Sequence, residues 1–174
     1  MNTLEAIAKR YSCRSYKPEQ IPEEALNEIL KAGMAAPVGS GAYDSLHITV
    51  IQNRELLNEI SGAVSEMVSK IFGRKVDKNF GAPTMIIVSS KPGRMTGMEY
   101  ANAACVLENM LIAATSLGID NIIHGGGSAV IAQSEELMQK LSIPEGFKPT
   151  LCASFGYAVQ EEAPKNHTIT VNQV

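Results

Sequence analysis

The chain has 174 residues, 45% of them hydrophobic and 19% charged, and a formal net charge of −3. This composition is ordinary for one soluble globular domain with a sizeable core, and it excludes the broad basic face that binding to nucleic acid or a membrane surface would require. The three cysteines form no CxxC pair, and the N-terminal sequence lacks the apolar core of a signal peptide. We therefore expect a reduced, cytoplasmic protein without a disulfide framework or a membrane-spanning segment.

Two helices and an extended segment are expected in the first 40 residues. Apolar residues at helical spacing follow Asn2, which can cap a helix, and residues 13–16 look extended. A second helix starts at Pro22, with the proline at its first position and two glutamates in the first turn, and Pro37 ends it. The small, polar residues from Pro37 to Asp44 indicate a flexible loop.

Four runs of β-branched and apolar residues predict the strands of a sheet. They are Leu46–Gln52, Thr84–Ser90, Ile119–His124 and Pro149–Tyr157. The second run is apolar enough to be buried on both faces of the sheet. A further short strand, Thr168–Val171, stands alone in the polar tail 158–174.

Further helices are expected between these strands. Asn53 and Ser134 can cap two of them. The longest covers Met98–Leu117 and is apolar nearly all round, so we place it at the centre of the core. The order of elements predicts an α+β layer sandwich, not a strict βαβ repeat.

The densest group of anion-binding side chains follows the first helix, in the stretch Lys9–Tyr16. Arg10 and Arg14 can fork onto phosphate oxygens, and the hydroxyl of Ser12 can donate to the same group. A solvated basic helix end that complements its own dipole explains the same residues equally well. From spacing alone, the two interpretations remain open.

Other candidate groups are weaker. The triglycine 125–127 lets a ligand approach the backbone, but it fits neither a dinucleotide fingerprint nor a P-loop, and a plain turn explains it. The three histidines have no partner at metal-ligand spacing, so no metal site is expected. A nucleophilic role for Cys13 would need a histidine base that the sequence does not indicate, and Cys105 and Cys152 are most simply core residues.

Four motifs taken together resemble the FMN-dependent nitroreductase family over nearly the full length. They are Arg10-Tyr11-Ser12-Cys13-Arg14-Ser15-Tyr16, Ala36-Pro37 before a small-residue loop and the strand His47–Ile51, Leu117-Gly118-Ile119-Asp120 with Gly125-Gly126, and Gly156-Tyr157 followed by Pro164-Lys165-Asn166-His167. Each motif is weak alone, whereas their order and spacing are specific. The resemblance implies an α-β-α sandwich of three layers with a mixed central sheet and a long buried helix.

The resemblance also implies which residues hold FMN. Arg10 and Lys165 would hold the phosphate, Ser12 would bond the phosphate or the ribityl chain, and Arg14 would reach the ribityl or pyrimidine side. His167 stands where the family usually has arginine, so its phosphate contact would be weaker and sensitive to pH. Tyr11 would lie near the phosphate through its backbone.

At the other end of the cofactor, the resemblance implies that Gly125 and Gly126 place backbone N–H groups near the N5 and O4 edge of the flavin. Ile123 and His124 would lie against one face of the ring. The flavin would do the chemistry, so no catalytic side chain is expected. The loop Val38–Ser45 departs from the family pattern, and a trimmed region around Ile71–Lys78 accounts for the short chain.

By the same resemblance, the protein is a homodimer with FMN at the subunit interface, in which the tail 158–174 of a single domain, 1–174, wraps the partner. The implied activity is ping-pong transfer of electrons from NADH or NADPH to a small-molecule acceptor such as a nitroaromatic or a quinone. A flavin-binding storage or sensor protein without nicotinamide-dependent turnover is the alternative. A third possibility, an anion-binding module without flavin, explains only Arg10 and Arg14.

Overall fold

The computed structural model describes residues 1–75, 80–93, 95–160, 162–163 and 167–174. Its sheet has the strand order β1-β2-β4-β3. The strands are β1 (Leu46–Ile51), β2 (Thr84–Ser90), β3 (Asp120–His124) and β4 (Lys148–Gly156). All three strand pairs are antiparallel, so the mixed sheet that the resemblance implied is wrong for these four strands; a parallel pairing occurs only as the isolated bridge between Ser12 and Asn121 among the described residues.

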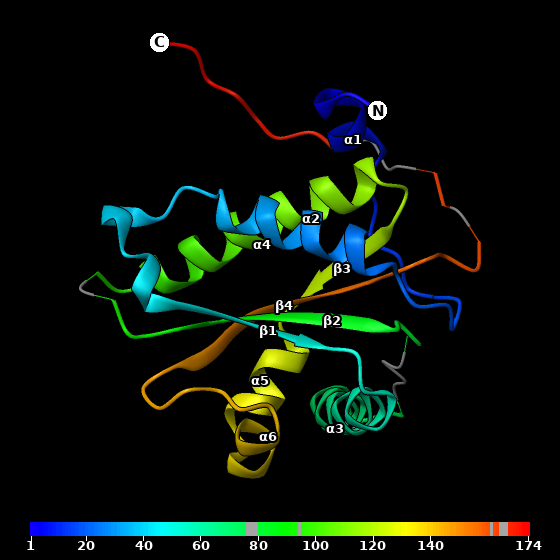
Figure 1. The fold of residues 1–174 in the computed structure, drawn as a ribbon, viewed down its shortest axis with the longest axis vertical. Helices are drawn as coiled ribbons and strands as arrows, with labels where there is room; N and C mark the ends of the chain where they lie inside the picture. The colour runs from blue at the N-terminus through cyan, green and yellow to red at the C-terminus, as the bar shows by residue number, and fades with distance from the viewer. Residues whose placement is uncertain (76–79, 94, 161, 164–166) are drawn as a thin grey trace.

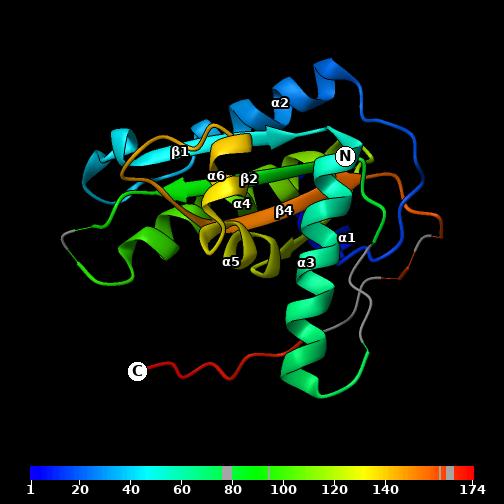
Figure 2. The same ribbon diagram turned by 90° about the horizontal axis from the view of Figure 1, so that it is seen from below.

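Helices cover both faces of this sheet (Figures 1 and 2). On one face lie α1 (Thr3–Lys9), α2 (Glu23–Met34) and α4 (Met98–Ser116); on the other lie α3 (Arg54–Phe72), α5 (Gly126–Ala132) and α6 (Glu135–Lys140). Two short 3-10 turns, Gly39–Gly41 and Tyr43–Ser45, connect α2 to β1. The α-β-α sandwich predicted from the sequence is confirmed.

The core has two halves because strand side chains alternate between the faces of the sheet. All seven residues of β2 are buried, as predicted. Ile86 and Val88 pack toward α2 and α4, whereas Met85 and Ile87 pack toward α3, α5 and α6. The central strand therefore serves both halves of the core.

Helix α4 lies at the centre of the larger half of the core, as predicted, although only one of its faces is buried in the single chain. Leu107, Met110 and Leu111 are fully buried against the sheet and α2. Cys105, predicted as a core residue, is exposed on the opposite face, whereas Cys152 is buried as predicted. The apolar composition of α4 exceeds what the fold of one chain buries.

Helix boundaries follow the predicted caps closely. The side chains of Asn2, Asn53 and Ser134 each accept a hydrogen bond from the backbone of the first turn that follows. Pro22 is the N-cap of α2 and has extended dihedrals, so it stands one position before the place we predicted. Helix α5, which begins within the triglycine, was not predicted.

The end of the tail makes no strand within the described part of the chain. Ile169 and Val171 are 88% and 81% exposed, so the predicted strand 168–171 finds no sheet edge in its own chain.

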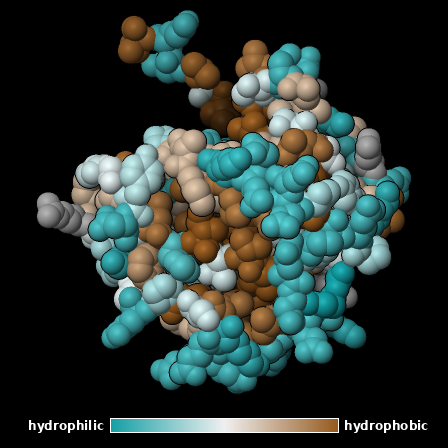
Figure 3. Space-filling view, viewed as in Figure 1, coloured by the Kyte–Doolittle hydropathy of each residue, from teal (hydrophilic) through white to brown (hydrophobic). Residues whose placement is uncertain are grey.

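Strand β1 is an open edge of the sheet, and Figure 3 shows apolar side chains gathered on the face where β1 lies. In the described residues, no helix is both long and apolar enough to cross a lipid bilayer.

Candidate functional site

The segment after α1 is fixed against the edge strand β3. The amide of Cys13 donates to the carbonyl of Asn121 at 3.0 Å, and the amide of Tyr16 donates to Phe80 at 3.0 Å. A second isolated bridge joins Tyr16 to Ala158. These bonds hold the extended segment alongside the first residues of β3.

A cavity of about 230 Å³, which we call the anion cavity, brings five of the predicted residues together, Tyr11 among them. Its lining includes Arg10, Ser12, Arg14 and His167, with Glu162 as its acidic member. Arg14 is partly held by a hydrogen bond from its Nη1 to the carbonyl of Ser12 at 3.1 Å. The buried Nη1 of Arg10 has no hydrogen-bond partner among the described residues. These donors suit an anion, and Lys165 lies outside the described residues.

A second cavity, of about 300 Å³, continues from Arg14 and has a mainly apolar wall; we call it the apolar cavity. Ile123, His124 and Gly126 from the predicted site line it. Gly125, the N-cap of α5, is exposed and is not among the lining residues. Because Arg14 lines both cavities, an elongated ligand can place an anionic end in one and a flat apolar end in the other.

Helix α3 forms the far wall of the apolar cavity, which the sequence did not indicate. Ile60, Ser61, Val64 and Val68 contribute to it. A Cβ added to Gly126 would lie 2.9 Å from Cγ1 of Val64, so the small residue lets α3 and α5 approach closely. The glycine pattern predicted a close approach of backbone, but its partner in the free chain is this helix.

His124 is held by the sheet beneath the apolar cavity. Its Nε2 lies 3.0 Å from Oγ of Ser154, and its Nδ1 lies 3.4 Å from Sγ of Cys152. Burial lowers the pKa of His124 to about 4, so the ring is neutral at pH 7. Burial raises the pKa of Cys152 to about 12, and its thiol donates to the carbonyl of His124.

The structure does not support a nucleophilic role for Cys13. Its side chain is 2% exposed, and burial raises the pKa of its thiol. Burial, and then the nearby carboxylate of Asp120, likewise raise the pKa of the Tyr11 phenol. No group of three histidine, cysteine or acidic side chains in the described residues could hold a metal ion. The two cavities offer anion-binding donors and an apolar slot.

The loop Val38–Ser45 lies away from both cavities. The amide of Gly39 donates to Oδ1 of Asn102 at 2.9 Å, and the hydroxyl of Tyr43 donates to the carbonyl of Ala36 at 3.1 Å. Figures 1 and 2 place the loop at the end of the sheet opposite α3. In one chain, the loop therefore contributes nothing to the walls described above.

Comparison with known proteins adds an independent result. The sequence model described as "Nitroreductase family" matches residues 7–157. A protein of Methanothermobacter thermautotrophicus, provisionally named an NADH dehydrogenase/NAD(P)H nitroreductase, is 30% identical over 170 residues, which cover 95% of this chain and 82% of that protein.

Two crystal structures of nitroreductases with bound FMN are also similar. The one from Desulfitobacterium hafniense has a TM-score of 0.87 and 30% identity, covering 99% of this chain and 100% of that chain. The one from Bacteroides fragilis has a TM-score of 0.83 and 30% identity, covering 100% of this chain and 97% of that chain. Both similarities extend across the cavities described above.

Proposed function

The chain belongs to the nitroreductase family, and we propose that it is an FMN-dependent oxidoreductase that takes hydride from NADH or NADPH and reduces a small-molecule acceptor, such as a nitroaromatic or a quinone, by ping-pong turnover. The observation that carries the proposal is the convergence of Arg10, Ser12, Arg14 and His167 on one cavity that shares Arg14 with an apolar cavity. This pair of cavities suits a phosphate joined to a flat ring. The similar proteins crystallised with FMN support the same cofactor.

The residues of this chain bind the cofactor and orient it. When bound, FMN supplies the redox chemistry. Arg10 and Arg14 offer charged donors to the phosphate, and Ser12 adds a hydroxyl donor. Ile123 and the residues of α3 exclude water from the apolar cavity, and His124 stays neutral beneath it. No side chain is assigned a proton-transfer step.

We also propose that the protein works as a homodimer with FMN at the interface and with each tail on the partner. Three observations support this: the uncovered face of α4, the open edge of β1 and the exposed apolar residues Ile169 and Val171. The loop Val38–Ser45, which contributes nothing to the site of its own chain, would then reach the partner's site. Residues 1–174 are one domain in this proposal.

We place the protein in the cytoplasm, because Cys13, Cys105 and Cys152 are all free thiols.

An anaerobic titration tests the proposal. Purified protein should be yellow, and adding NADH or NADPH without oxygen should bleach the flavin absorbance; a quinone or nitroaromatic should then restore it. Protein that takes up no FMN would contradict the proposal.

A flavin store or sensor is the second candidate, and the loop Val38–Ser45 favours it, because Gly41 and Ser45 stand where the family usually has asparagine and tryptophan. Bound flavin that neither nicotinamide cofactor reduces would favour this candidate over an oxidoreductase. Both candidates predict a yellow protein. They differ in whether NADH or NADPH then bleaches the flavin absorbance.

A further inference from the structure

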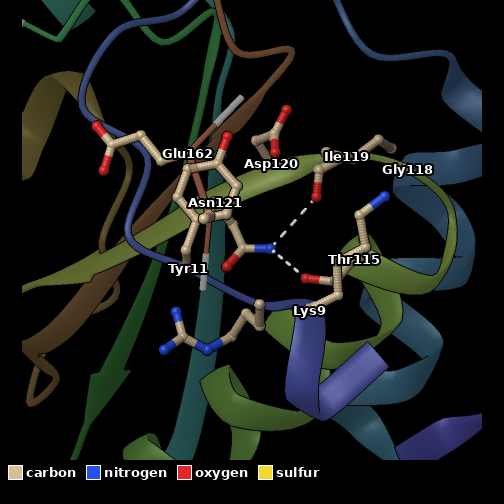
Figure 4. A pocket seen from close by; sticks show the side chains of 10 residues that line it. Lys9, Tyr11, Thr115, Gly118, Ile119, Asp120, Asn121 and Glu162 are labelled. Atoms are coloured by element: carbon tan, nitrogen blue, oxygen red, sulfur yellow. Dashed lines mark hydrogen bonds between the residues drawn. The ribbon is translucent and has the colours of Figure 1, made fainter. Parts of the chain in front are cut away.

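A third cavity, of about 370 Å³, lies behind the segment that lines the anion cavity (Figure 4). Its walls come from the end of α1, the end of α4, the start of β3 and the tail. Arg10, Tyr11 and Glu162 line this cavity as well as the anion cavity, so they separate the two. Its size lies within the roughly 300–1,000 Å³ of small-molecule sites. We call it the Asn121 cavity.

Buried polar atoms without partners are concentrated here. The described residues contain seven such side-chain atoms, and three of them, Nη1 of Arg10, the hydroxyl of Tyr11 and Oδ1 of Asn121, belong to residues that line this one cavity. Leaving a buried donor or acceptor unpaired is unfavourable, because the group has lost its water without gaining another partner. Arg10 and Tyr11 also line the anion cavity, whereas Asn121 lines only this one of the two cavities, so its buried unpaired oxygen is the atom that indicates a ligand here.

The orientation of Asn121 is fixed by its own hydrogen bonds. Its Nδ2 donates to the carbonyls of Leu111 and Ile119 at 3.0 and 3.3 Å, and to Oγ1 of Thr115 at 3.0 Å. A flipped amide would turn its oxygen toward two carbonyls that can only accept. Oδ1 must therefore face away from them, and Figure 4 shows it turned away from Thr115 and Ile119. The side chain is 1% exposed.

The charges around the cavity select a neutral ligand. Lys9 and Arg10 bring two positive charges, and Asp120 and Glu162 bring two negative ones. A phosphate would meet two carboxylates and the acceptor of Asn121, whereas a metal ion would meet the two cations. The anion cavity next to it, with Arg14 and His167 in addition, is the better phosphate site.

The unpaired atoms then define the edge of that ligand. Oδ1 of Asn121 requires a donor, and the guanidinium of Arg10, which lines both cavities and has five N–H donors, can offer one of them to this ligand and others to the phosphate. Burial, and then the neighbouring carboxylate of Asp120, raise the pKa of the Tyr11 phenol and keep it protonated, so its hydroxyl can serve either partner. A donor beside an acceptor on a neutral planar group is the hydrogen-bonding edge shared by nucleobases and carboxamides.

We propose that the Asn121 cavity is a second binding site, separate from the flavin, for a neutral molecule that presents a nucleobase or carboxamide edge. Asn121 accepts from the ligand, Arg10 donates to it, and Tyr11 completes the contact. The site goes beyond the proposed function, because the ligand it would bind is a second molecule and not the flavin.

Calorimetric titration of the FMN-saturated protein with adenosine, and separately with nicotinamide, tests the proposal. At least one probe should bind with one site per chain and leave the flavin spectrum unchanged, which separates this site from stacking on the ring. Inorganic phosphate should give no heat at this site. The titration extends to about 10 mM, a concentration that corresponds to a binding free energy of about −3 kcal/mol. Absence of heat from both organic probes over this range would overturn the proposal and leave only water in the cavity.

Matched variants locate the binding. Tyr11→Phe removes one hydroxyl and should weaken the probe about three- to ten-fold, as the loss of one hydrogen bond does. Tyr43→Phe removes a hydroxyl that bonds Ala36 far from the cavity and should change nothing. Asn121→Leu should weaken the probe more than ten-fold; because it also removes three donated bonds, Tyr11→Phe decides the matter if that variant does not fold. Equal affinity in wild type and Tyr11→Phe would refute the location.

The outcomes for flavin and for this cavity are distinguishable. Colourless protein that takes up no FMN would contradict the proposed function, and the same probes could still be titrated into it. A yellow, NADH-reducible protein that binds neither probe would overturn the Asn121 cavity as a site and leave the proposed function intact.

Discussion

The amide of Cys13 donates a hydrogen bond to the carbonyl of Asn121 at 3.0 Å, and this bond sets where the Arg10–Arg14 segment lies. It holds the segment parallel to the first residues of β3, so that Ser12 lines the anion cavity and Arg14 lines both the anion and the apolar cavity. Arg10 lines the anion cavity and the Asn121 cavity. One backbone contact thereby joins the anion cavity to the strand that ends at His124.

Arg14→Ala should lower the affinity for FMN by about 10- to 100-fold, because a hydrogen bond to a charged group contributes about 1.5–3 kcal/mol. Arg14 lines both cavities and is exposed, so its loss should leave the fold intact. Flavin fluorescence during titration measures the affinity, with the exposed Lys31→Ala on α2 as the control. Equal retention of FMN in the two variants would contradict the assignment.

Gly126→Ala should destabilise the protein by about 1–3 kcal/mol, as overpacking does, because the new Cβ would lie 2.9 Å from Cγ1 of Val64. Adding Val64→Ala should remove the clash and recover part of the loss relative to Val64→Ala alone. Gly125→Ala is the matched control, since its Cβ meets nothing within 4 Å. Urea denaturation gives the free energies of unfolding. Equal values for Gly126→Ala and Gly125→Ala would rule out the contact.

The layered fold was predictable because its signals are local and mutually consistent. Strand Thr84–Ser90 was predicted with its observed bounds, since a continuous apolar run suits a strand buried on both faces. The caps at Asn53 and Ser134 were likewise predicted from residue type. What failed was Cys105, because an apolar helix does not reveal whether its second face meets its own chain or another.

The site was predictable only in part. Arg10, Ser12, Arg14 and His167 were predicted through their likeness to a family motif, and the structure brings them to one cavity. The wall that α3 contributes was missed, because apolar residues at helical spacing look the same whether they face a core or a slot. The unpaired oxygen of Asn121 is visible only once its amide donors have been placed.

Gly33→Ala should cost about 1–3 kcal/mol of stability. A Cβ at this position on α2 would overlap Cε and Cγ of Met110 on α4, inside the larger half of the core. Gly62→Ala on α3 is the opposite case, because nothing lies within 4 Å; it should stabilise by up to about 1 kcal/mol through helix propensity. Thermal unfolding compares the two, and a shift of the same sign in both would contradict the packing described.

His124 should make stability depend on pH. Burial lowers its pKa to about 4, against an ordinary value of about 6.5, so the unfolded chain binds a proton more readily between these values. The stability is fully present above pH 6.5 and is lost as the pH falls toward 4, by at most about 3 kcal/mol. His124→Gln should flatten that part of the urea-denaturation profile. If stability falls equally in wild type and in His124→Gln between pH 6.5 and 4, burial does not hinder protonation of the His124 ring in the folded protein.

Ile169→Asp and Val171→Asp should weaken the dimer, because both side chains are exposed in the single chain and are expected to be buried on the partner. Burying one such side chain contributes about 1.5–3 kcal/mol, so each variant should raise the dimer dissociation constant about ten-fold or more. The described residues of the tail form no strand, so neither change should alter the stability of an isolated chain. Val174→Asp adds the same charge at the chain end and serves as the control. Sedimentation velocity measures the assembly, and wild-type dimerisation in both variants would place the tail in solvent instead of on the partner.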